Sequence, residues 1–229
     1  AKVTILRLPS GPFAGRQVSV KPIRRISGSP FARVRTPGSV AVARRGTGWF
    51  SLLVCNNYAG MVTEHIVAKP IGYSPVISRL AFQHGLEIPD GVAVSHDGRW
   101  AAISSHDTND VKIFETSRLG STVEPIGVLA KANYPHGLRF TADDRHVLVA
   151  DAGDRVVHVY ERGAGWEGTR EPARSITVID EAAFLRGRHN PQEGGPKGLD
   201  IDRSNRIVAT TCEEQTLAFF ALPSFLGNG

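Results

Sequence analysis

Four segments of this 229-residue chain repeat one pattern, in which a proline, a variable residue and a glycine precede an alternating apolar stretch; in the first copy the glycine follows the proline directly. The third copy reads PHGLRFTADDRHVLVADAGDRVVHVYE over residues 135–161, and the second and fourth copies align with it almost without gaps. The first copy has a two-residue insertion in its first turn. The repeat glycines are Gly38, Gly91, Gly137 and Gly198. Self-similar segments that recur along a chain in this way indicate a fold built from repeated structural units.

Each copy carries the pattern of three strands joined by polar turns. In the third copy apolar residues alternate at period two over 138–140, 147–149 and 157–159, as expected for strands with one buried face. The stretches between copies, at 124–130 and 173–179, add a fourth, outer strand. Four antiparallel strands recurring every ~40–50 residues predict an all-β fold, a β-propeller of four-stranded antiparallel blades.

The repeats predict one domain over residues 1–229. Its four blades lie at about 37–82, 89–130, 135–180 and 196–221. Residues 1–36 fit the repeat least, and strand patterns at 3–8 and 16–23 predict a partial blade there. The last copy has no fourth strand of its own, so we expect residues 1–8 to supply it and close the ring. A helix of one or two turns is predicted within 181–188.

The chain length is short for a propeller. With about 53 residues between repeat glycines, it holds little more than four blades. Either the ring is unusually small, or the sequence is a piece whose remaining blades lie elsewhere or come from a second chain or a second copy.

The quoted segments resemble the repeats of known propellers. The third copy, with Pro-His before its first strand and Asp-Ala-Gly-Asp-Arg-Val after its second, resembles the lactonase-type (YVTN or 6-phosphogluconolactonase-like) propellers. The second copy, beginning PDGVAVSHDGRW, is similar to gluconolactonase and NHL propellers. The resemblance covers about residues 37–221 and implies a propeller fold. It also implies a functional histidine in the Pro-His motif, here His136. The glutamate and arginine that accompany it in the family have no counterpart at matching positions.

The residue before each repeat glycine is expected at the mouth of the central channel. Connectivity brings the start of each first strand to the same end as the loop between the second and third strands, and binding sites commonly lie on such loops. The mouth positions are Pro37, Asp90, His136 and Lys197. The surrounding loops supply His106, Asp107, Asp151, Asp154, Glu213 and Glu214.

Asp90 and His136 come from neighbouring copies and are expected to reach each other. An imidazole beside a carboxylate can act as a general base on an ester or water. The same pair can supply two ligands to a divalent metal, with a third from His106, Asp107 or Glu213. A third interpretation is structural, with His136 as a hydrogen-bonded channel residue and Asp90 as a turn cap.

The remaining candidates also have two interpretations. Lys197 can hold a carboxylate or phosphate as a point charge, and Asp154 can either contact a ligand or belong to a structural turn. The segment 189–195, in the longest insertion between copies, is either a lid over the channel mouth or a linker. Cys55 and Cys212 fall at equivalent strand positions, which favours packing over a nucleophilic role, and they predict no disulfide framework.

The charge is strongly segregated along the chain. Residues 1–63 contain ten Lys and Arg and no acidic residue, whereas the remainder carries 17 basic and 22 acidic residues. Such a segment can bind nucleic acid or an anionic surface, but its bases come singly or in pairs with few aromatics and no RNA-binding motif. A solvated strand face, or contact with the acidic remainder, is favoured. No apolar run approaches the ~18 residues of a membrane span, and the compartment is not indicated.

Two functions from different classes follow. The first is a binding scaffold that presents its loop end to a protein, glycan or small ligand, without a required cofactor. The second is a lactonase-like hydrolase of a small anionic lactone or sugar acid, with His136 as general base.

Overall fold

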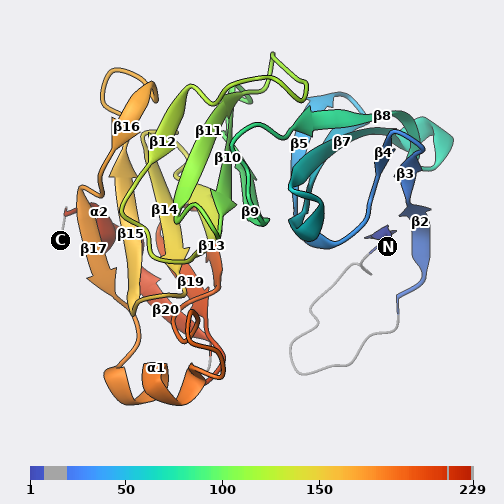
Figure 1. Ribbon diagram of the computed structural model, residues 1–229. Helices are drawn as coiled ribbons and strands as arrows, with labels where there is room; N and C mark the ends of the chain where they lie inside the picture. The colour runs from blue at the N-terminus through green and yellow to red at the C-terminus, as the bar shows by residue number, and fades with distance from the viewer. Residues whose placement is uncertain (8–19, 216, 228–229) are drawn as a thin grey trace.

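The fold is almost entirely β-structure. The computed structural model describes residues 1–7, 20–215 and 217–227 (Figure 1). Within these residues the helices are α1 (Glu181–Gly187), α2 (Leu222–Leu226) and the 3₁₀ turns Asn57–Ala59 and Lys69–Ile71. The helix predicted within 181–188 is confirmed, with Asp180 capping its first turn. No helix among the described residues has both the length and the apolarity to span a membrane.

Each sequence repeat forms its own antiparallel sheet, as predicted. The first sheet contains β5 (Pro37–Gly46), β6 (Trp49–Asn56), β7 (Met61–Ala68) and β8 (Ser74–Phe82). The second contains β9 (Pro89–Val94), β10 (Trp100–Ser105), β11 (Asp110–Glu115) and β12 (Gly127–Leu129). The third contains β13 (Pro135–Phe140), β14 (His146–Asp151), β15 (Val156–Glu161) and β17 (Arg174–Thr177). The fourth contains β18 (Gly198–Ile201), β19 (Ile207–Thr211) and β20 (Ala218–Ala221).

The outer strands lie where the sequence predicts them. The stretches 124–130 and 173–179 contain β12 and β17, each paired with the third strand of its own sheet. A strand that the sequence did not predict, β16 (Gly168–Arg170), leaves the third repeat and pairs in parallel with β12. The second and third repeats are therefore joined by hydrogen bonds as well as by packing.

The N-terminal region forms two small hairpins and does not complete the last sheet. Strand β1 (Val3–Leu6) pairs with β2 (Pro22–Ile26), and β3 (Gly28–Ser29) pairs with β4 (Ala32–Arg33). The prediction that residues 1–8 supply the fourth strand of the last sheet is therefore wrong for the described residues, because β1 and β2 form a separate sheet and the last sheet consists of β18, β19 and β20. The beginning of the strand predicted at 16–23 lies outside the described residues.

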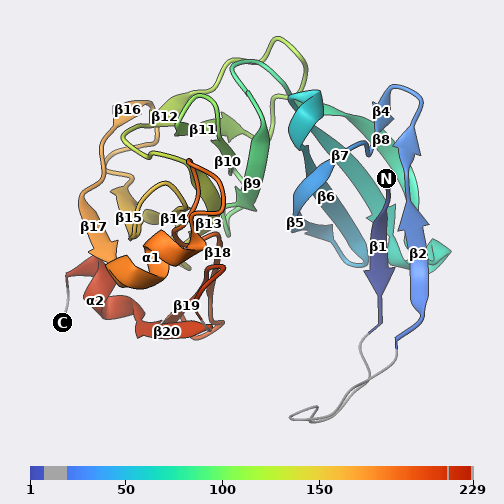
Figure 2. The same ribbon diagram turned by 60° about the horizontal axis from the view of Figure 1, so that its bottom comes forward.

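The sheets pack face to face in chain order, with their first strands side by side (Figure 2). Residues of β5, β9, β13 and β18 jointly line a cavity of about 320 Å³. No sheet formed by the described residues closes this series into a ring.

In the second strand of a central sheet, successive side chains point to opposite faces and so pack at two different interfaces. In β10, Ile103 packs against the first sheet, whereas Ala102 packs against the third. In β14, Val149 packs against the second sheet and Leu148 against the fourth. These strands are apolar on both faces because each face contacts another sheet.

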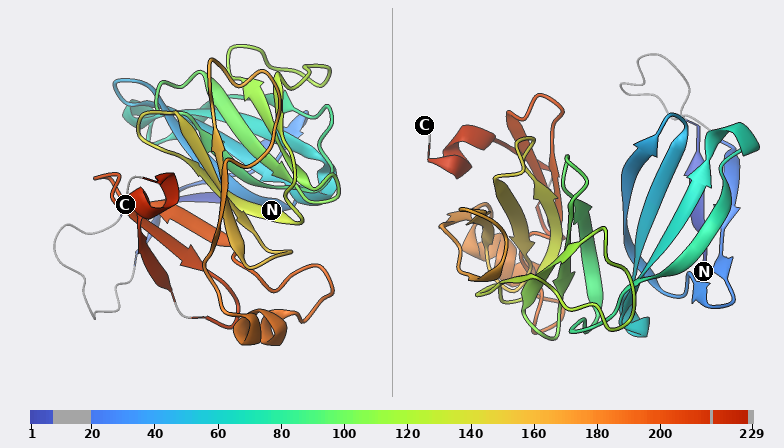
Figure 3. Two further views of the ribbon diagram at one scale, coloured as in Figure 1. Left: turned by 90° about the vertical axis from the view of Figure 1, so that its left-hand side faces the viewer. Right: turned by 90° about the horizontal axis from the view of Figure 1, so that it is seen from above.

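The two ends of the series differ in what covers them. The N-terminal hairpins lie over the far face of the first sheet, where Ile26 packs on Leu52 and Val67 (Figure 3). On the fourth sheet, Ile207 and Phe219 are 45% and 63% exposed, so its far face is uncovered by the described residues.

We call the end of the sheets where the first strands begin the loop end. At the opposite end, in the third and fourth sheets, a side chain of the turn between the first and second strands reaches the preceding sheet. Asp144, between β13 and β14, accepts hydrogen bonds from the backbone N–H groups of His96 and Asp97 at 2.7 and 2.9 Å. Asn205, between β18 and β19, accepts one from Ala142 N–H at 3.0 Å. Both residues have φ of 56°, the left-handed conformation found at the equivalent Gly98. We call these contacts the turn ties.

The acid-free N-terminal segment contacts the first acidic residue that follows it. The Glu64 carboxylate is fully buried and pairs with Arg45 and Arg79, each at 2.6 Å. Burial raises the pKa of Glu64, but hydrogen bonds from Ser51, Arg79 and Arg45 outweigh it and hold the pKa below its ordinary value. The sequence favoured contact of the basic segment with the acidic remainder over nucleic-acid binding. For Arg45, its ion pair with Glu64 is such a contact.

The turn ties are expected to stabilise the packing of successive sheets. Replacing Asp144 by Gly keeps the left-handed turn unstrained and removes hydrogen bonds to a charged acceptor, so Asp144→Gly should lower the free energy of unfolding by about 2 kcal/mol. Asn205→Gly removes one neutral bond and should cost about 1 kcal/mol. Urea unfolding followed by fluorescence measures both, and Asp144→Gly unfolding at the wild-type midpoint would contradict the role of the ties.

The Glu64 ion pairs should make stability depend on pH. Since the pKa of Glu64 is lower in the folded state, its contribution is complete above the unfolded pKa of about 4.3 and is lost as pH falls through the folded value. Glu64→Gln should cost about 3 kcal/mol at pH 7 and less at each lower pH below 4.3. Urea midpoints of both proteins from pH 7 to pH 3 provide the measurement. A difference that stays constant over this range would show that the charge of Glu64 contributes nothing.

Candidate functional site

The repeat glycines bring neighbouring first strands into backbone contact at the loop end, where the first strands begin. A Cβ added to Gly91 would overlap the carbonyl oxygen of His136, and one added to Gly137 would lie 2.7 Å from the carbonyl oxygen of Lys197. The Gly137 N–H also donates a hydrogen bond to that Lys197 oxygen at 2.9 Å. Because each glycine touches the residue before the next glycine, the variable residues of the repeat are held close together.

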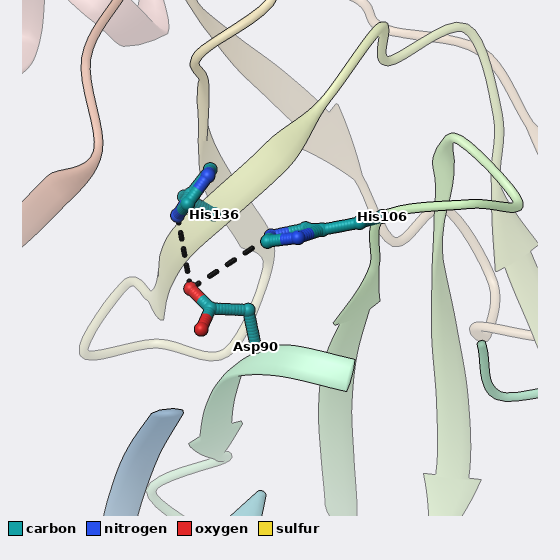
Figure 4. A group of neighbouring side chains, drawn as sticks. All are labelled: Asp90, His106 and His136. Carbon is teal, nitrogen blue, oxygen red and sulfur yellow. Dashed lines mark ion pairs between the residues drawn. The ribbon is translucent and has the colours of Figure 1, made fainter. Parts of the chain in front are cut away.

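Asp90 and His136 meet as the sequence predicts, and His106 joins them (Figure 4). The Oδ2 atom of Asp90 lies 2.9 Å from His136 Nδ1 and 3.8 Å from His106 Nε2. Asp90 lies near the start of β9, His136 lies near the start of β13, and His106 directly follows β10. Three segments from two repeats therefore place two imidazoles around one carboxylate oxygen. We call these three residues the histidine–aspartate centre.

Two residues that sequence reasoning missed hold this centre in place. The amide of Asn57 donates from Nδ2 to Asp90 Oδ1 at 2.7 Å. The Tyr134 ring lies 4.2 Å from the His106 ring, centroid to centroid, and the His136 ring lies 4.3 Å from His106 on the same measure. Tyr134 directly precedes the Pro-His motif, which is the signal that could have identified it. Asn57 lies in the loop of the first copy that corresponds to the His106 loop of the second, which places it at the loop end, but its contact with Asp90 depends on how the first two sheets pack.

The electrostatics keep Asp90 charged and His106 neutral. Burial raises the pKa of Asp90, but the hydrogen bond and charge of His136 and the hydrogen bond of Asn57 outweigh it, so the pKa lies below its ordinary value. Burial, followed by the neighbouring His136, lowers the pKa of His106 to about 4. At neutral pH, His106 therefore presents an uncharged ring to a carboxylate.

Several polar atoms of the centre have no hydrogen-bond partner among the described residues. The Nε2 atoms of His106 and His136 and the Oδ1 atom of Asn57 are buried without one. The His106 side chain is only 6% exposed.

Two histidines elsewhere in the protein differ from those of the centre in their hydrogen bonding. His158 bonds Ser175 and Asp151 through its two ring nitrogens, at 2.8 and 3.0 Å. His65 likewise bonds Ser78 and Thr63, at 3.0 and 2.9 Å. The site histidines thus retain free nitrogens that His158 and His65 do not, although Nδ1 of His146, in β14 and outside the centre, is also buried without a partner.

Lys197 lies at its predicted mouth position but is already paired. Its ammonium contacts Glu193 and lies 3.6 Å from Glu213. Glu193 belongs to the segment 189–195, so this segment is held against the loop end by an ion pair. Glu213 and Glu214 lie 3.8 and 3.6 Å from His189 of the same segment. These contacts hold the segment 189–195 at the loop end, which both the lid and the linker interpretation allow.

A cavity of about 360 Å³ lies between residues 188–192 and the second and third sheets. His106 and Tyr134 line it on the side of the sheets, and Arg188 and Gln192 line it on the opposite side. The exposed Asp107 also borders it. Its volume falls in the range of sites for small molecules, about 300–1,000 Å³.

Two other predicted positions lie outside the cavity. The Asp154 carboxylate accepts a hydrogen bond from the N–H of Arg155, the next residue, at 2.6 Å. Asp151 accepts hydrogen bonds from the N–H groups of Asn133 and Tyr134 at 2.7 and 2.8 Å. Asp151 therefore positions the Tyr134 backbone and acts on the site indirectly.

Cys55 has the packing role that the sequence favours. It is buried, and its thiol donates to the carbonyl oxygen of Gly91 at 3.6 Å. Burial raises the pKa of Cys55 far above its ordinary value, so the thiolate does not form at neutral pH.

Comparison with known proteins gives a likeness in fold only. No family model and no curated protein sequence matches the chain. Among many similar solved structures is Kuenenia stuttgartiensis hydrazine synthase, with a TM-score of 0.58 and 16% sequence identity. The match covers 87% of this chain and 50% of that chain, so the chain spans about half the length of this structural relative. This likeness and the all-β series of sheets are compatible with a β-propeller fold. They do not distinguish a lactonase-type from an NHL-type repeat.

The close approach at Gly91 should be essential to the centre. Gly91→Ala places a methyl group on the His136 carbonyl and forces the second and third sheets apart, so we expect a loss of about 2–3 kcal/mol in the free energy of unfolding. Gly137→Ala meets its neighbour at 2.7 Å and should cost less, about 1 kcal/mol. Urea denaturation measures the loss of unfolding free energy in each variant. A larger loss in Gly137→Ala than in Gly91→Ala would disprove this account of the repeat glycines.

Proposed function

We propose that this chain is a β-propeller-type scaffold that binds a small polar ligand at its loop end, anchored by the histidine–aspartate centre. The observation that carries the proposal is the pair of buried imidazole nitrogens without partners, on His106 and His136, beside one carboxylate. A buried polar atom left unsatisfied costs about 1–3 kcal/mol. A ligand that bonds these atoms recovers that energy, which favours a binding role over a purely structural one.

The surroundings indicate what kind of molecule fits. A hydroxyl group can donate to the free Nε2 of the neutral His106 ring when the ring proton is on Nδ1, and to Asn57 Oδ1. The Arg188 guanidinium, which borders the cavity, can bind a carboxylate, whereas Lys197 is occupied by Glu193 and Glu213. These features favour a hydroxylated carboxylate, such as a sugar acid, over an apolar ligand.

A second function is favoured by one contact, the 2.9 Å approach of His136 Nδ1 to Asp90. A carboxylate that holds Nδ1 orients an imidazole and leaves Nε2 free to accept a proton from water. His136 does not itself line the cavity, so a lactone would have to extend past His106 to reach it. There His136 would act as the general base of a lactonase-like hydrolase.

One panel of sugar acids and their lactones tests both functions. Calorimetry with the wild-type protein should show saturable binding of a sugar acid, and His106→Gln should weaken it about tenfold or more, the loss expected for one buried hydrogen bond with its unpaired partner. The control is His96→Gln, since His96 also pairs with an aspartate, Asp144, but at the opposite end of the sheets.

Turnover separates the scaffold from the hydrolase. Lactone hydrolysis that His136→Gln abolishes would establish the hydrolase, whereas saturable binding without hydrolysis supports the scaffold. Equal binding by the wild type and His106→Gln, or no binding of any panel member, would refute the proposed site.

A further inference from the structure

We infer that Asp90, His106 and His136 form a mononuclear site for a divalent transition metal such as zinc. This inference rests on the proposed function in one respect, because it concerns the same centre and names its inorganic ligand. It is carried by the ligand atoms themselves, by their burial and by the way neighbouring residues hold them.

The ligand atoms converge as a metal requires. One nitrogen from each imidazole and one carboxylate oxygen all lie within 4.8 Å of one another. The separations from Asp90 Oδ2 are 2.9 Å to His136 and 3.8 Å to His106. Tetrahedral ligands about 2.0–2.2 Å from zinc are separated by about 3.4 Å, so the two distances bracket the required value.

The chemistry of the donor set selects the class of metal. Two imidazoles with one carboxylate suit zinc and neighbouring transition metals, whereas calcium and magnesium prefer oxygen ligands throughout. Three protein ligands leave a fourth position open. Such a position could be taken by water or by a carboxylate or hydroxyl of the organic ligand.

The carboxylate is also prepared by its neighbours. Asn57 bonds Asp90 through Oδ1, the oxygen that does not face the histidines, and so leaves Oδ2 directed at them. Residues that hold a metal ligand from behind in this way commonly set its orientation. The His106 ring is likewise held in contact with both the Tyr134 and the His136 rings.

A purely structural role for the centre explains its residue types and its unbonded nitrogen less well than a metal site does. The repeat does not require an acid or a histidine before its glycine, because the first and fourth copies have Pro37 and Lys197 there. His106 is 94% buried, as its 6% exposure implies, and its Nε2 atom faces Asp90 from 3.8 Å without a hydrogen bond. A nitrogen buried at this distance from a carboxylate has room for an ion between them.

Titration of the chelator-treated chain with zinc, by calorimetry, and with cobalt, by its visible absorption, tests the inference. We expect one equivalent to bind, and His106→Gln and Asp90→Asn each to weaken affinity by about tenfold or more. His96→Gln is the matched control, because His96 also pairs with an aspartate, Asp144, but lies at the opposite end of the sheets. Melting curves of the metal-free variants confirm that they are folded.

The outcomes separate this inference from the proposed function. Failure of the wild type to bind zinc or cobalt, or equal affinity in folded His106→Gln, would overturn the metal site. Sugar-acid binding by the metal-free wild type would then leave the scaffold function standing. One equivalent of metal lost in His106→Gln, with no organic ligand bound, would support the metal site and refute the organic ligand.

Discussion

Backbone contact between neighbouring first strands determines where the functional groups of this protein lie. At Gly91 there is no room for a side chain against the His136 carbonyl, so β9 and β13 meet at van der Waals distance. The residues beside these glycines are then fixed next to one another. Asp90 and His136 are neighbours for this reason, although 46 residues separate them in the chain. The position of the centre is thus a property of the packed backbone, and its chemistry depends on which residues occupy the variable positions.

The apolar core follows from the same arrangement. Since each central sheet has a neighbour on both faces, its second strand divides its side chains between two clusters, as β10 and β14 do. Rigid packing on both faces leaves little freedom at the strand ends. The loops that carry His106 and Tyr134 start from these ends. A pre-formed centre with unbonded nitrogens can persist only on such a frame, because a softer one would rearrange to bond them.

The sequence predicted the features that repeat and missed those that occur once. Periodicity identified the four sheets, the outer strands at 124–130 and 173–179, and the meeting of Asp90 with His136. It could not reveal that Asn57 holds Asp90 or that Glu193 holds Lys197, because these contacts depend on the relative placement of neighbouring sheets. It gave the wrong partner for β1, since an alternating apolar stretch shows that a strand forms without showing which edge it joins. Asp154 shared its loop with functional candidates, yet its carboxylate only caps its own turn.

The turn ties give the series of sheets a direction. Asp144 of the third sheet holds the second, and Asn205 of the fourth holds the third, so the second and third sheets are each tied by the sheet that follows in the chain. A growing polypeptide would therefore receive each tie only when the next repeat has been made. Loss of the fourth sheet would remove a single tie, whereas loss of the third would remove two. Repeat arrays coupled only to their nearest neighbours behave in this way. For this chain, the C-terminal repeat is the one that can open while the histidine–aspartate centre, built by the second and third repeats, stays assembled.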